Sequence, residues 1–304
     1  MKFSAPHRIK SIAALYRRLG KPAPHHPLVS VERFTTSDTN RLEACSPLVL
    51  DFYCIAVKQN VHGKLRYGQQ HYDYDEGVML YTSPGQVMYH TAETAARSEG
   101  ICLSVHPEFL KGYGLARTIH DYGFFAYDVN EALHLSEAEE DRLLRIMEDI
   151  SKEHRGNFDK TTHDVIIAQV ELLLQYSNRY YQRQFMTRKS ENEDVLLRLE
   201  AILKELLQQP DGMRDTLVTV REVARRLNLS PDYLSDLLRS FTGLNTQQYI
   251  HEKLVDRAKV MLATTDMSVG EIAYQLGFQH PQSLSRLFKR KTQRTPQSYR
   301  RSVK

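Results

Sequence analysis

An internal repeat in the last third of the chain limits its fold more than any other feature, because both copies must form the same small unit. The first copy, residues 220–249, reads VREVARRLNLSPDYLSDLLRSFTGLNTQQY, and the second, residues 269–299, reads VGEIAYQLGFQHPQSLSRLFKRKTQRTPQSY. With one residue inserted at the turn of the second copy, identical residues pair from Val220 with Val269 to Tyr249 with Tyr299. The last third is therefore predicted to contain one structural unit twice.

Each copy has the pattern of two short helices joined by a tight turn. In the first copy, apolar residues recur at the spacing of one helical face: Val220, Val223, Ala224 and Leu227. Ser230 and Pro231 predict the start of a second helix, because a serine hydroxyl caps backbone N–H groups and proline fits the first helical position. Gly243 predicts its end. The pattern therefore predicts two helix-turn-helix units, at 219–243 and 268–292.

The segment between the copies, residues 246–262, has apolar residues spaced as in one connecting helix. At about 1.5 Å per residue it spans roughly 25 Å, which can set two recognition helices about one DNA turn, ~34 Å, apart. An α-helical repeat that contacts other proteins is the alternative. A cluster of basic residues favours DNA: Arg286, Lys289, Arg290, Lys291, Arg294, Arg300 and Arg301.

The distribution of charge points the same way. Residues 219–304 hold 15 Lys/Arg against 7 Asp/Glu, a net +8, although the whole chain carries only +4. The remaining residues are therefore mildly acidic. A basic module beside an acidic one is typical of nucleic-acid binders, and a basic face that only contacts solvent is the alternative.

The second copy resembles the AraC/XylS family of transcription regulators, whose motif reads close to IAxxxGFxxxSxFSRxFKKxxGxTPxxYR. The matching pairs are Ile272-Ala273, Gly277-Phe278, Ser285-Arg286, Phe288-Lys289, Thr295-Pro296 and Tyr299-Arg300. Two positions depart from the family. Gln293 stands where the family has glycine, which predicts that the last recognition helix lacks its left-handed cap. Leu284 replaces the usual aromatic residue, as a tolerated change in the core.

The resemblance implies that the outward residues of each second helix enter the major groove of DNA: Asp232, Ser235, Asp236 and Arg239 in the first unit, and Gln282, Ser283, Arg286 and Arg290 in the second. By its chemistry, Gln282 suits an adenine edge, Arg286 suits guanine or a phosphate, and Asp236 suits cytosine. Lys289, Lys291 and Arg294 suit phosphates. Because Asp232 and Asp236 repel phosphates, the first unit is expected to bind loosely or to position the second.

The rest of the chain predicts a β-rich domain followed by helices. Strand-like stretches at 48–57, 77–82, 86–89 and 101–105 alternate with turn residues, which favours a small β-barrel or jelly roll. The resemblance implies a cupin-like barrel there. The predicted fold class is α+β, with a cupin-like sensory and dimerisation domain at 1–187 (barrel about 26–106, helices about 107–187). A linker is predicted at 188–195, followed by an all-α DNA-binding domain at 196–304.

Helix 161–185 is a candidate dimer interface. Its apolar stripe has helical period: Val165, Ile166, Ala168, Leu172, Leu173, Tyr176 and Tyr180. Packing against its own barrel is the alternative, and one helix can do both. The resemblance implies an antiparallel homodimer.

Candidate effector-binding residues are Tyr53, Tyr67, Tyr72, Tyr81 and His90, together with Tyr74 and Tyr89. Rings with hydroxyl groups suit a sugar, an aromatic compound or an acyl compound, whereas half-exposed positions on a sheet are the alternative. His62, His71 and Asp73 raise the question of a metal. No metal is predicted, because the closely spaced His-x-His of metal cupins is missing.

Three further observations limit the function. No catalytic triad, Cys/His pair or phosphate loop appears at useful spacing, so neither an enzyme nor a cofactor is predicted. Cys45, Cys54 and Cys102 are sparse and odd in number, which predicts free thiols and a cytoplasmic location. No stretch predicts a membrane span or a signal peptide.

The sequence therefore predicts a sequence-specific regulator that binds double-stranded DNA and responds to a small effector or partner at its N-terminal domain. The first alternative is a ligand-independent regulator whose barrel only dimerises or contacts a partner such as RNA polymerase. The second is a metal-cupin enzyme fused to a DNA-binding module.

Overall fold

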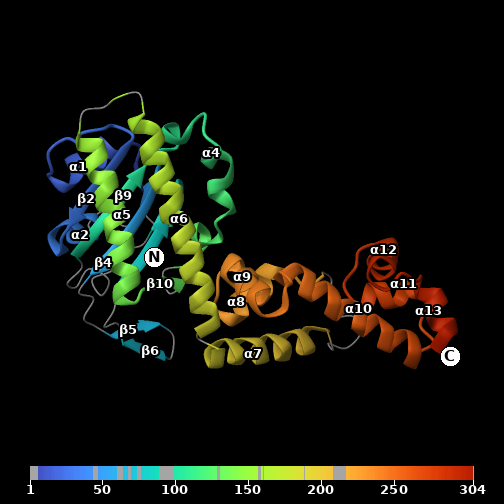
Figure 1. The fold of residues 1–304 in the computed structure, drawn as a ribbon. Coiled ribbons are helices and arrows are strands. Elements are labelled where there is room, and N and C mark those ends of the chain that lie inside the picture. Colours follow the sequence, from blue (N-terminus) through green and yellow to red (C-terminus); the bar gives the residue numbers. More distant parts are fainter. Residues whose placement is uncertain are drawn as a thin grey trace. The chain divides into compact units, whose positions relative to one another are not determined.

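The computed structural model describes residues 6–43, 47–59, 64–67, 70–73, 77–88, 99–128, 131–156, 159, 161–187, 189–207 and 217–303. The chain divides into two compact units, Met1–Gln184 and Phe185–Lys304. The first unit combines sheets with helices, and the described part of the second is helical (Figure 1). The α+β fold class is thereby confirmed.

A five-stranded sheet forms the centre of the first unit. Its order is β10 (Leu133–His134), β7 (Val78–Thr82), β4 (Tyr53–Gln59), β9 (Glu99–Val105) and β2 (Val29–Phe34). Every neighbouring pair is antiparallel, and Ile55 of β4 lies opposite both Tyr81 and Leu103. Because side chains alternate along a strand, this register decides which residues share a face.

Two smaller sheets are also present among the described residues. One has the order β1 (His7–Ile9), β3 (Leu48–Leu50) and β8 (Val87–Met88), and β5 (Lys64–Tyr67) pairs with β6 (Gln70–Asp73). Within the described ranges, strand pairing does not close these sheets into one barrel. The structure therefore supports a β-rich unit rather than the closed barrel that the sequence led us to expect.

One face of the five-stranded sheet, here called the helix-covered face, packs under helices (Figure 1). Helix α5 (Glu137–Arg155) contacts β2 and β9, and the 3-10 turn η3 (Gly123–Ala126) contacts β7. The residues of this face are almost fully buried: Val31, Ile55, Val57, Met79, Ile101 and Leu103. Their burial supplies the main core of the unit.

The opposite face, here called the inward face, carries smaller and more polar residues: Ser30, Glu32, Cys54, Ala56, Lys58, Leu80, Thr82, Cys102 and Ser104. It lies toward helix α1 (Ile12–Leu19) and the β1-β3-β8 sheet. Cys54 packs against the apolar cluster of those elements, and the Thr82 hydroxyl lies 3.4 Å from the Met88 sulfur of β8. Helix α2 (Thr36–Glu43) packs beside α1.

Helix α6 (Thr162–Thr187) buries one side, and the apolar stripe read from its sequence is divided between this buried side and the exposed one. Ile166, Val170 and Leu173 are buried, whereas Val165 and Leu172 are 38% and 47% exposed. Between β9 and α5 lie η1 (Pro107–Leu110), α4 (Leu115–Thr118), η2 (Ile119–Asp121) and η3. Among the residues with a described placement, no helix is long and apolar enough to span a membrane.

In the second unit, helix α7 (Lys189–Leu207) includes most of the predicted linker at 188–195, so this stretch is helical rather than irregular. The Asn192 side chain donates to the Phe185 carbonyl at 2.7 Å, which fixes the start of α7. Leu199, Leu203 and Leu206 enter the core of the helical unit.

Six further helices follow within the described residues 217–303. They are α8 (Val220–Leu227), α9 (Pro231–Thr242), α10 (Thr246–Thr264), α11 (Val269–Gln275), α12 (Pro281–Thr292) and α13 (Pro296–Val303). The Ser230 hydroxyl accepts from the Tyr233 N–H, and Pro231 occupies the first turn, as the sequence predicts. Helix α10 contacts α8, α9, α11, α12 and α13 and therefore joins the two repeats.

Candidate nucleic-acid interface

The second helix-turn-helix unit is built around a capped first helix. The Ser268 N–H donates to the Glu271 carboxylate at 2.6 Å, and the Glu271 N–H donates to the Ser268 hydroxyl at 3.2 Å. This reciprocal capping box fixes where α11 begins. Ile272 and Ala273 are fully buried and share a core with Leu284 of α12. The small alanine side chain lets the two helices approach closely.

The turn between α11 and α12 depends on Gly277, whose φ is +83°. This left-handed conformation is readily available only to glycine. Leu284, Leu287 and Phe288 then bury one side of α12. The opposite side of α12 is consequently left to solvent.

The exposed side of α12 carries the residues that the resemblance placed in the major groove. Gln282, Ser283, Arg286, Lys289 and Arg290 are all exposed. Within the described part of the chain, the Arg286 and Arg290 guanidinium groups form no ion pair or side-chain hydrogen bond. Two unneutralised cations one helical turn apart suit an anionic partner such as a nucleic-acid backbone.

Two other basic residues near α12, Lys291 and Arg300, already have partners. The Lys291 ammonium pairs with the Glu252 carboxylate of α10 at 3.2 Å. The Arg300 guanidinium donates to the backbone carbonyls of Leu262 and Met267, so it joins α13 to the end of α10. Arg300 is therefore a structural residue, although its sequence position groups it with the basic cluster.

The exit of α12 differs from the expectation. Gln293 adopts a left-handed φ of +59°, and its N–H donates to the Lys289 carbonyl at 2.8 Å. Its side-chain amide also donates to the Arg290 carbonyl at 3.2 Å. The left-handed cap is therefore present without glycine, and the prediction that it is missing is wrong. The bond from the backbone N–H is the one that a left-handed cap makes with any residue, so the cap forms at Gln293 at some cost in backbone strain.

The exposed side of α9 is chemically different. The Asp236 carboxylate pairs with the Arg239 guanidinium at 2.6 Å, and the Ser235 hydroxyl lies 3.1 Å from that of buried Thr246. Partial burial, together with the neighbouring Asp236 carboxylate, raises the pKa of Asp232. Most of the polar groups on α9 are thus engaged within the protein.

The structure places two of the candidate effector residues on the helix-covered face. Tyr81 is buried against Phe124 and Tyr181, with ring centroids 4.3 and 6.0 Å away, and Tyr53 lies 5.1 Å from Phe125. They pack in an aromatic cluster rather than on the inward face. Their role in effector binding stays a prediction, which this packing does not favour.

The other candidates lie wholly or partly outside the described residues. His90, His62, Tyr74 and Tyr89 have no described placement, and only the strand pairing is described for Tyr67, Tyr72, His71 and Asp73. Among the described side chains, no group of three His, Cys, Asp or Glu residues could hold a metal ion.

Sequence reasoning missed Lys58, which shares the inward face with Cys54 and Ala56. Burial lowers the pKa of the Lys58 ammonium. Lys58 directly follows the strand-like stretch 48–57, and a lysine beside such an apolar stretch was the signal that could have identified it.

Comparisons with known proteins support these assignments for the C-terminal unit. A family model described as "Helix-turn-helix domain" matches residues 223–302. The regulatory protein SoxS of Salmonella typhimurium is 32% identical over 101 residues, which are 33% of this chain and 94% of SoxS. The arabinose operon regulatory protein of the same organism is 29% identical, over 36% of this chain and 43% of the relative.

Two further matches cover about a third of the chain. The match spans only 37% of the uncharacterized regulator YijO of Escherichia coli. Among solved structures, the DNA-binding domain of AdpA in complex with a target DNA is 28% identical, with a TM-score of 0.31, over 36% of this chain and 90% of that one. Because nearly the whole length of SoxS aligns at 32% identity, the chain belongs to the AraC/XylS family of transcription regulators.

Proposed function

We propose that this protein is a sequence-specific DNA-binding transcription regulator that reads its operator chiefly through α12. The observation that carries this proposal is the uncompensated cationic side of α12, held outward by a buried core and a glycine turn. Arg286 and Gln282 would contact base edges, with Ser283 beside them. Lys289, Arg290 and Lys291 would contact phosphates.

The first helix-turn-helix unit would contribute less to the reading of the DNA sequence. On α9, Asp236 holds Arg239, and Ser235 is bonded toward α10, so Asp232 is the remaining exposed polar group. A carboxylate beside a phosphate backbone is repelled. Helix α9 would therefore position α12 rather than read bases itself.

Binding of the full-length protein to a genomic fragment library, measured across a salt series, tests this proposal. We expect a short enriched motif, and affinity that falls as salt rises because phosphate contacts release counterions. Arg286→Ala should cost about 1–3 kcal/mol and relax the motif at one position. Arg239→Ala is the matched control on α9, where Asp236 already neutralises the arginine, and it should change the motif little.

Two results would argue against this assignment of roles. Binding without an enriched motif would contradict sequence-specific regulation. An equal relaxation by Arg239→Ala would show that α9 also reads bases.

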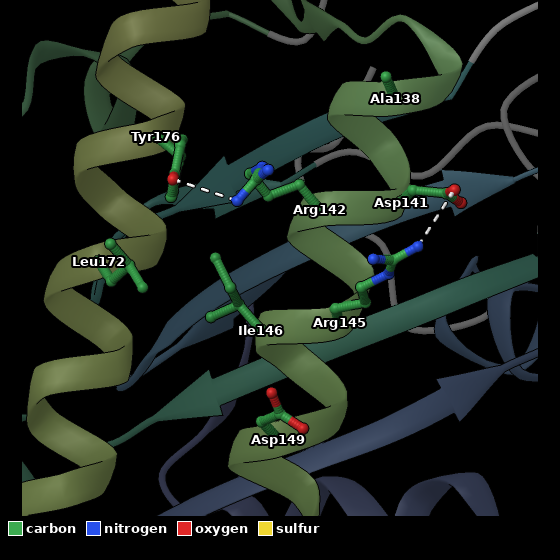
Figure 2. A pocket seen from close by; sticks show the side chains of 8 residues that line it. All are labelled: Ala138, Asp141, Arg142, Arg145, Ile146, Asp149, Leu172 and Tyr176. Atoms are coloured by element: carbon green, nitrogen blue, oxygen red, sulfur yellow. Dashed lines mark hydrogen bonds and ion pairs between the residues drawn. The ribbon is translucent and has the colours of Figure 1, made fainter.

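We further propose that the protein acts as a homodimer through α6. The exposed Leu172 and the adjacent Tyr176 border a groove of about 370 Å³ against Arg142 and Ile146 of α5 (Figure 2). The Arg142 guanidinium donates to the Tyr176 hydroxyl at 3.3 Å, so the polar rim of the groove is ordered. A second copy could bury the apolar side chains that α6 leaves exposed.

The N-terminal unit is proposed to be a cupin-like sensory and dimerisation domain within 1–187, joined through 188–195 to the DNA-binding domain at 196–304. A small effector would act by binding one state of the regulator more tightly than another. Contact with RNA polymerase at the operator is part of the same proposal. The free thiols of Cys54 and Cys102 suit a reducing cytoplasm.

A further inference from the structure

Two cysteines lie side by side on the inward face of the five-stranded sheet. Cys54 of β4 lies opposite Ser104 of β9, and Cys102 of β9 lies opposite Ala56 of β4. The two cysteines are therefore diagonal neighbours on adjacent strands, with their side chains on the same face. A hydrogen bond between the two thiols raises the pKa of Cys54 and lowers the pKa of Cys102. The structure thus holds two free thiols in contact.

A third sulfur atom comes from the smaller sheet next to this face. Thr82 of β7 lies opposite Cys54, on the side of β4 away from β9. The Thr82 hydroxyl lies 3.4 Å from the Met88 sulfur of β8. Cys54 and Met88 also pack against the same apolar cluster, which is built mainly from α1, β1 and β3. The thioether of Met88 is therefore held beside the strand position next to Cys54.

These sulfur-bearing residues are not sealed into the core. Cys54, Cys102 and Met88 are each partly exposed, whereas Ile55 and Leu103 on the helix-covered face are at most 1% exposed. Free cysteines and methionines that only fill space are usually buried. Partial exposure at all three positions leaves them within reach of a small ion from solvent.

The spacing of the two cysteines suits a bridging ion better than a disulfide. A disulfide needs Cβ atoms about 3.8 Å apart, whereas the Cβ atoms of diagonal neighbours are roughly 6–7 Å apart. Two metal–sulfur bonds of about 2.3 Å each can hold two sulfur atoms up to about 4.6 Å apart. Thiolate and thioether ligands select Cu(I) over ions that prefer oxygen ligands.

We propose that Cys54, Cys102 and Met88 bind one soft monovalent cation of the Cu(I) type. On binding, both thiols release their protons to solvent, and the two thiolates and the neutral thioether donate electron pairs to the cation. No electron is transferred, and the complex carries a single negative charge. The cation would be the effector of the proposed regulator, so its regulatory role rests on that proposed function.

Titration of the full-length protein with Cu(I), under anaerobic and reducing conditions, tests the proposal. The competitor is bicinchoninate, a chelator that is coloured when it holds Cu(I), so loss of colour measures transfer to the protein. We expect one Cu(I) to bind per chain, and Ag(I) to compete for the same site. Zn(II) should bind roughly a hundredfold or more weakly, because it prefers four ligands in a tetrahedron.

Three variants test the three ligands. Cys54→Ser and Cys102→Ser should each weaken Cu(I) binding roughly a hundredfold or more, because a hydroxyl is a hard ligand. Met88→Leu keeps the apolar volume and should weaken it roughly tenfold. Two matched controls should leave Cu(I) binding unchanged: Cys45→Ser, at the cysteine outside the described residues, and Met186→Leu, at a methionine that is 61% exposed.

The proposal is overturned if Cu(I) does not bind, if Zn(II) binds equally well, or if any of the three ligand substitutions leaves the Cu(I) affinity unchanged. Circular dichroism checks that each variant is folded, and alanine replaces a serine that prevents folding. Binding to the enriched DNA motif is measured separately in the same preparations. Absence of motif binding in every preparation would contradict the regulatory function and leave the copper titration standing.

Discussion

At the scale of single residues, two of the described residues other than glycine adopt a left-handed backbone conformation. Asn228 ends α8 with a φ of +56°, and Gln293 ends α12 with a φ of +59°. Asparagine tolerates this region better than most residues, whereas glutamine does not. The strain therefore falls mainly on Gln293, at the exit of the helix proposed to read DNA.

Replacing Gln293 with glycine should stabilise the second helix-turn-helix unit by roughly 1 kcal/mol, because glycine adopts a positive φ without steric cost. The exposed bond from the Gln293 amide to the Arg290 carbonyl is lost but contributes little. Thermal unfolding of the full-length protein measures the change. Asn228→Gly is the matched control and should gain less, and a Tm lowered by Gln293→Gly would contradict the expected strain.

The sequence predicted some residue roles and not others, for a physical reason. Caps such as Ser230-Pro231 depend on contacts within a few residues, so they could be predicted locally. The pairing of Asp236 with Arg239 depends on rotamers, and the left-handed cap at Gln293 is formed by a residue that no cap motif specifies. These interactions had to be seen in the structure.

At the scale of elements, the helices of the repeat were predictable, and the faces of the sheet were not. The apolar spacing of α8, α9, α11 and α12 appears directly in the sequence. The face to which Tyr53, Tyr81 or Lys58 belongs depends on strand register and on what covers each face. A shift of one residue exchanges the two faces. The effector candidates were therefore the weakest part of the sequence-based site.

The end of α5 gives the first unit a dependence on pH. His154 is 5% exposed, its Nδ1 lies 3.3 Å from the Ile150 carbonyl, and its ring lies 6.2 Å from that of His25. Burial lowers the pKa of His154, with Arg155 and His25 adding to the effect. Burial also lowers the pKa of His26, which packs on Phe109 of η1.

Because the folded-state pKa of His154 is depressed, the unfolded chain takes up the proton first as pH falls below about 6.5. The free energy of unfolding should therefore fall in this range. We expect the Tm to drop by a few degrees between about pH 7.5 and about pH 5.5. His154→Gln should reduce this drop, whereas His7→Gln, at an exposed position, should not. Parallel pH profiles for all three proteins would exclude a role for His154.

At the scale of the whole molecule, each unit has its own core, and a function that joins them must act through association or through shared elements. Helix α6 is the element best suited to association. Its inner side completes the core of the first unit, and its outer side leaves Val165 and Leu172 exposed. A dimer through α6 would place two DNA-binding units in one particle, which increases affinity for paired half-sites.

Leu172→Glu should shift the protein from dimer to monomer, measured by light scattering or analytical ultracentrifugation. Losing a buried leucine costs about 1.5–3 kcal/mol, so the dimer dissociation constant should rise roughly ten- to a hundredfold. Leu197→Glu on α7, where the leucine is 70% exposed, is the matched control and should leave the dimer intact. An unchanged oligomeric state in Leu172→Glu would exclude α6 as the interface.

The ion pair between Asp236 and Arg239 has a consequence for how such a regulator can change over generations. The partner of Arg239 is a single acidic side chain, and its replacement by asparagine would free a guanidinium on an exposed helix without disturbing the core. The first helix-turn-helix unit could then acquire a preference for new operator sequences, while α12 keeps its preference for the original ones. Duplicated copies of the gene could diverge by this route and recognise different promoters before either copy loses its original targets.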